Sequence, residues 1–374
     1  MDGAIPGSGL HMAELTSGLL PGLTVAVTGA TGNVGTALLR ALTAAGVKQV
    51  RGLARREPPD TTPYDGVRWY LADLGSRDSE EVLAEFLHDV DVVVHLAWAL
   101  QPGREPERLR QVNVEGTRRV LDAAVAAGVP HVLHMSSLGV YSAGPPSRRI
   151  TEDWPTEGVP SSQYSRDKVE CERLVRELVA EHPDVVVSVT RPTLVLQPEA
   201  SSEIGRYFLG ELGLAAARLL PGPVARLLPL PLPSLYVSFV HADDVAAAIV
   251  QILDRRAPGA FNLSAEPALS ADDLARALGS WRIPTPAVVL RTALDVAYRA
   301  HLVPTEPGWL DLGLGVPLLE SARARTVLDW KPAHRGDDVL REFVAALGRG
   351  EGADSPLLQP AGGPEHPPAA SPRS

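Results

Sequence analysis

Short β-branched runs alternate with segments of helical periodicity between residues 23 and 136. Strand-like runs cover 23–28, 50–54, 67–71, 91–96 and 132–136. Apolar positions at helical spacing cover 34–45 and 112–127, and Gly128 and Pro130 stop the second segment. Strands separated by helices in this way form right-handed βαβ units. The pattern therefore predicts an α/β fold built on a doubly wound parallel sheet.

Composition excludes several classes of protein. Hydrophobic residues make up 45% and charged residues 21% of the 374 residues, as in a globular protein with a core. The formal charge of −10 argues against a nucleic-acid partner, which a basic excess would favour. A single cysteine, Cys171, allows neither an intrachain disulfide nor a zinc site built from cysteines, so we expect a cytoplasmic protein. No uninterrupted apolar run reaches the about 18 residues of a membrane span, so no membrane association is expected.

The two ends of the chain differ in composition from the rest. Residues 1–22 have no basic segment before an apolar run, so we expect a flexible segment and no signal peptide. Residues 349–374 are rich in Pro, Gly, Ser and Ala, which predicts a disordered tail.

A glycine-rich turn joins the first predicted strand to the first predicted helix, with the sequence TGATGNVG at 28–35. Gly29 permits a tight turn, Gly32 lets the backbone approach a pyrophosphate, and Gly35 allows close packing of the helix. The helix N-terminus then offers free N–H groups to the phosphates. An ordinary loop-to-helix turn is the alternative, but the strand-turn-helix context favours a dinucleotide site.

The residues after the second predicted strand bear on the choice of cofactor. An NAD site calls for an acidic residue there, whereas this chain has Arg55 and Arg56. Guanidinium groups suit a 2′-phosphate, so NADP is favoured and NAD is the alternative. A solvated arginine pair in an arginine-rich chain would explain the same residues.

Tyr164 and Lys168 form a Tyr-x-x-x-Lys pair. With 7 tyrosines and three lysines in 374 residues, chance predicts far fewer than one such pair. Spacing of four places both side chains on one face of a helix. A phenol is a poor base at neutral pH, and a neighbouring ammonium favours its phenolate. The pair therefore indicates acid/base chemistry, against the alternative of a surface tyrosine and a solvated lysine.

The ordered set of motifs resembles the extended short-chain dehydrogenase/reductase family, also called the NAD-dependent epimerase/dehydratase family. The motifs are TGATGNVG at 28–35, ADL at 72–74, HLAW at 95–98, NVEGT at 113–117, SSLGVYS at 136–142, YSRDK at 164–168, RPTLVLQP at 191–198, VHADDVA at 240–246, FNLS at 261–264 and DWKP at 329–332. The resemblance implies a Rossmann-like domain at 23–190 and a smaller C-terminal α/β substrate-binding subdomain at 191–348, interleaved with the core.

The resemblance also implies roles for individual residues. Tyr164 is the general acid/base, Lys168 lowers its pKa and binds the nicotinamide ribose, and Ser137 holds the substrate oxygen. Ser136 is the alternative to Ser137. Asn113 matches an asparagine associated with the cofactor and the catalytic lysine, with a helix N-cap as the alternative. The expected cofactor-binding residues are Gly29, Thr31, Gly32, Asn33, Val34, Gly35, Arg55, Arg56, Asp73, Leu74, Leu96, Ala97, Trp98, Asn113, Tyr164, Lys168 and Pro192.

We expect an NADP(H)-dependent oxidoreductase that acts on a small alcohol/carbonyl pair. Leu138-Gly139 replaces the Asp-Glu pair of the family's dehydratases, and Thr193 replaces an asparagine common in sugar-nucleotide enzymes. A sugar-nucleotide 4-epimerase is the alternative, and a non-catalytic NADP sensor is an alternative of another class. The apolar stretch 209–237 is expected to wall the substrate pocket, and the family suggests a homodimer.

His241, Asp243 and Asp244 lie close together in the sequence. We interpret them as the opening of a helix, where acidic residues favour the dipole, and expect no metal site.

Overall fold

A computed structural model describes residues 20–47, 49–100, 104–208 and 229–360. Its centre is a seven-stranded sheet in the order β12-β7-β5-β4-β1-β2-β3, in which every neighbouring pair is parallel. The strands are β1 (Thr24–Thr28), β2 (Gln49–Ala54), β3 (Arg68–Leu71), β4 (Val92–His95), β5 (His131–Met135), β7 (Val186–Pro192) and β12 (Gly259–Leu263).

Helices cover both faces of this sheet. One face carries α1 (Asn33–Ala44), α8 (Ala242–Arg255) and α12 (Ala322–Leu328); the other carries α2 (Ser79–Leu87), α4 (Gly116–Ala126) and α5 (Gln163–Glu181). Successive strand residues point to opposite faces, so Val25 and Val27 pack under α1 while Ala26 packs under α4. Strands buried on both faces explain why the sequence shows continuous apolar runs.

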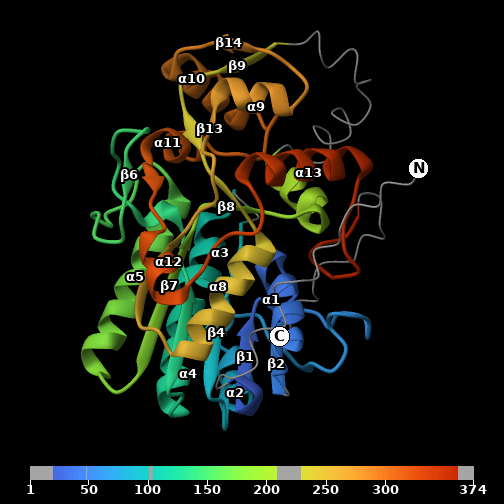
Figure 1. The fold of residues 1–374 in the computed structure, drawn as a ribbon, viewed down its shortest axis with the longest axis vertical. Coiled ribbons are helices and arrows are strands. Elements are labelled where there is room, and N and C mark those ends of the chain that lie inside the picture. Colours follow the sequence, from blue (N-terminus) through green and yellow to red (C-terminus); the bar gives the residue numbers. More distant parts are fainter. Residues whose placement is uncertain (1–19, 48, 101–103, 209–228, 361–374) are drawn as a thin grey trace.

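The remaining elements lie mostly beyond one end of the sheet (Figure 1). The short strands there form two-stranded pairs: β8 (Leu194–Leu196) with β11 (Phe239–His241), β9 (Leu230–Leu232) with β14 (Arg282–Pro284), β10 (Tyr236–Val237) with β13 (Leu269–Ser270), and β6 (Arg149–Ile150) with β15 (Leu318–Leu319). The helices are α9 (Ala271–Ala277), α10 (Ala287–Arg299), α11 (Gly308–Gly315) and α13 (Gly336–Arg349). Residues 201–208 are also helical.

Short helical turns connect the larger elements. They are η1 (Leu20–Gly22), α3 (Pro106–Arg110), η2 (Gln111–Glu115), η3 (Leu138–Val140) and η4 (Pro198–Ala200). The segment η2 is a π-helical turn that runs directly into α4.

The predicted doubly wound parallel sheet is confirmed, and the five predicted strands agree with the structure to within one residue at each end. The helix expected over 112–127 differs, because its first turn is π-helical. Residues 1–19, 209–228 and 361–374, which include parts of both predicted tails and of the predicted pocket wall, lie outside the described residues. None of the helices in the described ranges is long and apolar enough to cross a lipid bilayer.

Candidate active site

The loop between β1 and α1 brings backbone atoms closer together than any side chain would permit. Gly29 has a φ of 68°, and a Cβ there would lie 2.7 Å from the amide nitrogen of Ala97. A Cβ on Gly35 would lie 2.2 Å from the carbonyl oxygen of Gly29. The first turn of α1 begins at Asn33 without a capping side chain among the described residues, so its N–H groups are available to an anion. This geometry fits the pyrophosphate of a dinucleotide.

The same loop contacts segments that are distant in the sequence. The side-chain amide of Asn33 donates to the carbonyl oxygen of Val195 at 2.9 Å, and Gln197 donates to the carbonyl oxygen of Asn33 at 2.7 Å. The carbonyl oxygen of Thr31 accepts a hydrogen bond from Ser355 at 2.7 Å. Val34 is buried beneath the loop. The loop is thus held both by the region around β8 and by the C-terminal part of the chain.

Arg55 and Arg56 follow β2 directly, at the carboxyl end of the strand. Arg55 is exposed and Arg56 is half-buried. Burial raises the pKa of Glu203 to about 7, and the charge of Arg55 opposes this shift. Arg55 is therefore close enough to the helix at 201–208 to influence a buried carboxyl.

The end of β3 places two further cofactor candidates at the same edge of the sheet. Asp73, after β3, pairs with Arg108 and accepts a hydrogen bond from the amide of Gly75 at 2.9 Å. Leu74 is buried, and its carbonyl oxygen accepts a hydrogen bond from Arg119 at 2.7 Å.

Leu96, Ala97 and Trp98 follow β4, and Pro192 ends β7 opposite Leu263 of β12. All these residues lie at the carboxyl ends of parallel strands, where ligands bind in this class of sheet.

Tyr164 and Lys168 lie on the first turns of α5, one helical turn apart. The hydroxyl of Ser162 caps this helix by accepting from the amide of Ser165. Burial raises the pKa of Tyr164 to about 12, and a hydrogen bond with the Ser137 side chain opposes the shift. Burial also lowers the pKa of Lys168 to about 8.

The Lys168 ammonium has two close partners in this structure, and its expected effect on the pKa of Tyr164 stays a prediction. The ammonium of Lys168 donates to the carbonyl oxygen of Met135 at 2.9 Å and lies 3.5 Å from the ring centroid of Trp98. The Trp98 ring also meets Tyr164 edge-on, at 5.6 Å between centroids. The largest cause of the raised pKa of Tyr164 is its burial.

Ser137 and Asn113 hold backbone around the Tyr-Lys pair. The hydroxyl of Ser137 accepts from the amide of Gly139 at 3.1 Å, and a Cβ on Gly139 would lie 2.9 Å from the Tyr164 ring. Asn113 is buried in the π-helical turn, where its side chain accepts from the Ala99 amide at 2.7 Å and donates to the Ala99 carbonyl at 2.9 Å. Asn113 therefore holds the segment after Trp98 and is not a helix N-cap.

A buried ion pair joins Arg191 and Glu172 close to the Tyr-Lys pair. Both guanidinium nitrogens Nε and Nη2 of Arg191 donate to Glu172, at 2.8 and 2.7 Å, and both side chains are less than a tenth exposed. Ser136 also donates to Glu172 at 2.6 Å, and Arg191 donates to the hydroxyl of Tyr141 at 3.0 Å. The pair joins the end of β7 to α5, one turn after Lys168. This ion pair was not among the sequence-based predictions, although Arg191 lies in the Arg-Pro motif and Glu172 is four residues after Lys168.

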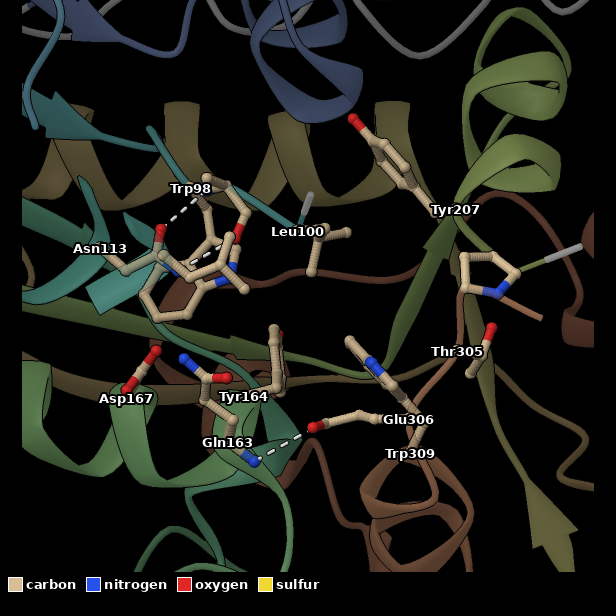
Figure 2. A pocket seen from close by; sticks show the side chains of 13 residues that line it. Trp98, Leu100, Asn113, Gln163, Tyr164, Asp167, Tyr207, Thr305, Glu306 and Trp309 are labelled. Atoms are coloured by element: carbon tan, nitrogen blue, oxygen red, sulfur yellow. Dashed lines mark hydrogen bonds between the residues drawn. The ribbon is translucent and has the colours of Figure 1, made fainter. Parts of the chain in front are cut away.

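Tyr164 opens into a pocket (Figure 2). Four aromatic side chains line it: Trp98, Tyr164, Tyr207 and Trp309. Trp309, on α11, lies 4.8 Å from Tyr164 between ring centroids. Trp309 was not among the predicted site residues, because no local pattern links a residue near 309 to a helix that starts at 163.

The charged groups of the pocket are carboxyl groups. Among the described lining residues there is no arginine or lysine. The carboxyl groups belong to Asp167 and Glu306, and Glu306 accepts from the amide of Gln163 at 3.3 Å (Figure 2). Burial raises the pKa of both, that of Asp167 to about 6. The described part of the pocket therefore combines aromatic side chains with polar and weakly acidic groups.

The acidic cluster around His241 caps a helix. The ring of His241 accepts from the amide of Asp243 at 3.1 Å, at the start of α8. The carboxylate of Asp244 accepts from the amides of Ala333 and His334 at 2.7 and 3.1 Å. Within the described residues, no group of three or more His, Cys, Asp or Glu side chains is placed to hold a metal ion.

A model of the NAD dependent epimerase/dehydratase family matches residues 25–264. The 3-diazoavenalumate denitrifying reductase of a Streptomyces species is 32% identical over 83% of this chain and 96% of its own length. The UDP-glucose 4-epimerase of Mycolicibacterium smegmatis is 30% identical over 82% of this chain and 92% of its own.

A solved short-chain dehydrogenase/reductase superfamily protein from Agrobacterium tumefaciens, with bound NAD, superposes with a TM-score of 0.62. It is 25% identical, over 86% of this chain and 96% of its own. The matches to two other curated relatives are partial, since the chain spans about half of their length.

Proposed function

The chain belongs to the NAD dependent epimerase/dehydratase family of enzymes, and on that premise we propose that it is an NAD(P)-dependent oxidoreductase. Its substrate is a small, largely apolar compound with an alcohol or carbonyl group. The observation that carries this proposal is the position of Tyr164, which faces an aromatic pocket with Ser137 and Lys168 beside it. When bound, the nicotinamide supplies or accepts the hydride.

The state of Tyr164 supports carbonyl reduction. A pKa of about 12 keeps its hydroxyl protonated at neutral pH, so it can donate a proton to a carbonyl oxygen as that oxygen gains negative charge. The Ser137 hydroxyl, already within hydrogen-bonding reach of Tyr164, holds the same oxygen. Lys168, with a pKa of about 8, is mostly a cation at pH 7 and stabilises the phenolate left behind.

A sugar-nucleotide 4-epimerase is the second candidate. The 30% identity to a UDP-glucose 4-epimerase supports it, and the Tyr, Lys and Ser needed for that chemistry are present. The described lining of the pocket supports reduction instead, because it offers carboxyl groups and no cation that would pair with a diphosphate. The retained Tyr164 and Lys168 argue against a non-catalytic sensor.

A turnover screen separates the two enzyme candidates. The protein is mixed with NADPH and a panel of aldehydes and ketones, and separately with UDP- and dTDP-sugars, and cofactor oxidation and sugar epimers are measured. The proposal predicts NADPH oxidation with an apolar aldehyde or ketone. Interconversion of UDP-sugars without net NADPH oxidation would favour the epimerase.

Arg55 and Arg56 support NADP as the cofactor, because both follow β2, where the 2′-substituent of the adenine ribose lies in this fold. Charge-assisted hydrogen bonds contribute about 1.5–3 kcal/mol each, so Arg55→Ala should weaken NADP binding at least about tenfold and leave NAD binding nearly unchanged. Fluorescence titration of both dinucleotides tests this. Tighter binding of NAD than of NADP by the wild type would overturn the assignment.

A further inference from the structure

The chain reverses direction after α13 and returns to the glycine-rich loop. Gly350 ends the helix with a φ of 71°, a left-handed conformation that turns the chain back. Residues 351–360, here called the C-terminal strap, then descend beside α1 (Figure 1). Composition alone assigns this segment to a disordered tail, but the strap contains a fully buried leucine, Leu358.

Hydrogen bonds fix the strap at both ends and in the middle. The hydroxyls of Ser201 and Ser202 donate to the carbonyl oxygen of Glu351, at 3.3 and 2.5 Å, and Arg206 donates to that of Gln359 at 3.3 Å. In the middle, the buried hydroxyl of Ser355 donates to the carbonyl oxygen of Thr31, as described above. The strap is thus attached to the helix at 201–208 and to the glycine-rich loop.

Leu357 lies on the side of Gly32 toward which a side chain would project. A Cβ built on Gly32 would lie 3.9 Å from Cδ1 of Leu357, which is van der Waals contact. In this fold the second glycine of the loop is required because the pyrophosphate approaches the backbone there. A leucine methyl offers no hydrogen bond to a diphosphate, and two groups cannot occupy the same space beside Gly32.

We propose that the C-terminal strap belongs to the dinucleotide site and competes with the cofactor, with Leu357 covering Gly32 until the pyrophosphate displaces it. The inference rests on the proposed function only in requiring that the chain bind a dinucleotide. Strap closure lowers the fraction of molecules able to bind, and the apparent dissociation constant rises in proportion. The cofactor and the strap therefore exclude each other.

The test uses the full chain with Leu357→Ala, which removes the leucine methyl groups beside Gly32 and keeps Ser355 and Leu358 as anchors. Leu302→Ala, on an exposed leucine remote in sequence from the strap, is the matched control. Dissociation constants for NADPH and NADH are measured by fluorescence titration, and association rates by stopped flow. Thermal unfolding shows whether each variant is folded.

The proposal predicts that Leu357→Ala binds NADPH at least about threefold more tightly and faster than the wild type, with no change in Leu302→Ala. Leu357→Trp, which enlarges the covering group, should act in the opposite direction. Unchanged or weaker binding by Leu357→Ala would overturn the proposal, even if the wild type turns over a carbonyl substrate. If no form binds either dinucleotide, both this inference and the proposed function fail.

Discussion

Burial favours the uncharged forms of Tyr164 and Lys168, and the two pKa shifts have different consequences. The pKa of Tyr164 rises to about 12 and that of Lys168 falls to about 8. At neutral pH the tyrosine is a proton donor and the lysine is still mostly charged, which suits reduction. Above pH 8 the lysine loses its charge first, so we expect it to limit activity on the alkaline side.

The rate of carbonyl reduction should therefore fall as the pH rises through about 8. Lys168→Arg tests this, because a guanidinium stays protonated throughout this range. The variant should be slower overall, since the planar group fits the site less well, but should show no fall near pH 8. Values of kcat/KM from about pH 6 to 10 decide the matter. If kcat/KM falls near pH 8 in both proteins, the titrating group is not Lys168.

Motifs predict residues that act through local spacing, and miss those that act through contacts across the fold. The spacing of four between Tyr164 and Lys168 was enough to place both on one helix face. Trp309 and Leu357 have no such pattern, because their partners Tyr164 and Gly32 lie far away in the sequence. Trp98 was predicted at a strand end, but its contact with the Lys168 ammonium depends on packing that the sequence does not show.

Elements of the active site are joined by the buried pair of Arg191, at the end of β7, and Glu172, on α5. Removing one partner of a buried pair leaves an uncompensated charge, whereas replacing both with apolar residues can be nearly neutral. The pair thus couples the folding of β7 to that of α5, the helix that carries Tyr164 and Lys168.

Arg191→Met should destabilise the protein by about 3–5 kcal/mol. Adding Glu172→Leu should recover most of this loss, because no buried charge remains. Arg173→Met, which removes exposed ion pairs with Glu170 and Glu177, is the control and should change stability little. Urea unfolding measures all three. A loss as small as that of the control would show that the pair does not support the site.

Histidines inside the sheet make stability depend on pH. Burial lowers the pKa of His95, on β4, to about 3 and that of His131, on β5, to about 4. Between about pH 4 and 6.5 the unfolded chain binds protons that the folded chain does not. Stability contributed by the neutral histidines is therefore present above pH 6.5 and is lost as the pH falls toward 4.

His131→Leu should flatten this dependence. The free energy of unfolding, from urea titrations at pH 7 and pH 5, should fall less in the variant than in the wild type, although the variant starts lower because Ser188 loses a hydrogen bond of 2.8 Å. An equal fall in both proteins would exclude His131 as a cause.

On the scale of the whole molecule, alternation of strands and helices was sufficient to predict the parallel sheet, because each βαβ unit is a local feature. Strand β12 pairs with β7 at the edge of the sheet, and the two segments are about 70 residues apart in the sequence. No periodicity in the sequence predicts such a pairing. Composition gives no indication of the strap either, since Pro, Gly and Ser are typical of disordered segments, whereas Ser355 and Leu358 are buried. The homodimer suggested by the family stays a prediction.

The role proposed for Tyr164 is that of the proton donor when hydride is transferred to a carbonyl substrate. The most direct test measures NADPH oxidation by Tyr164→Phe with a carbonyl substrate found in the screen, together with NADPH binding. Tyr298→Phe, on α10, is the matched control. We expect Tyr164→Phe to lose turnover by at least about a hundredfold, while its dissociation constant for NADPH stays close to that of the wild type. Turnover equal to that of the wild type would contradict this role.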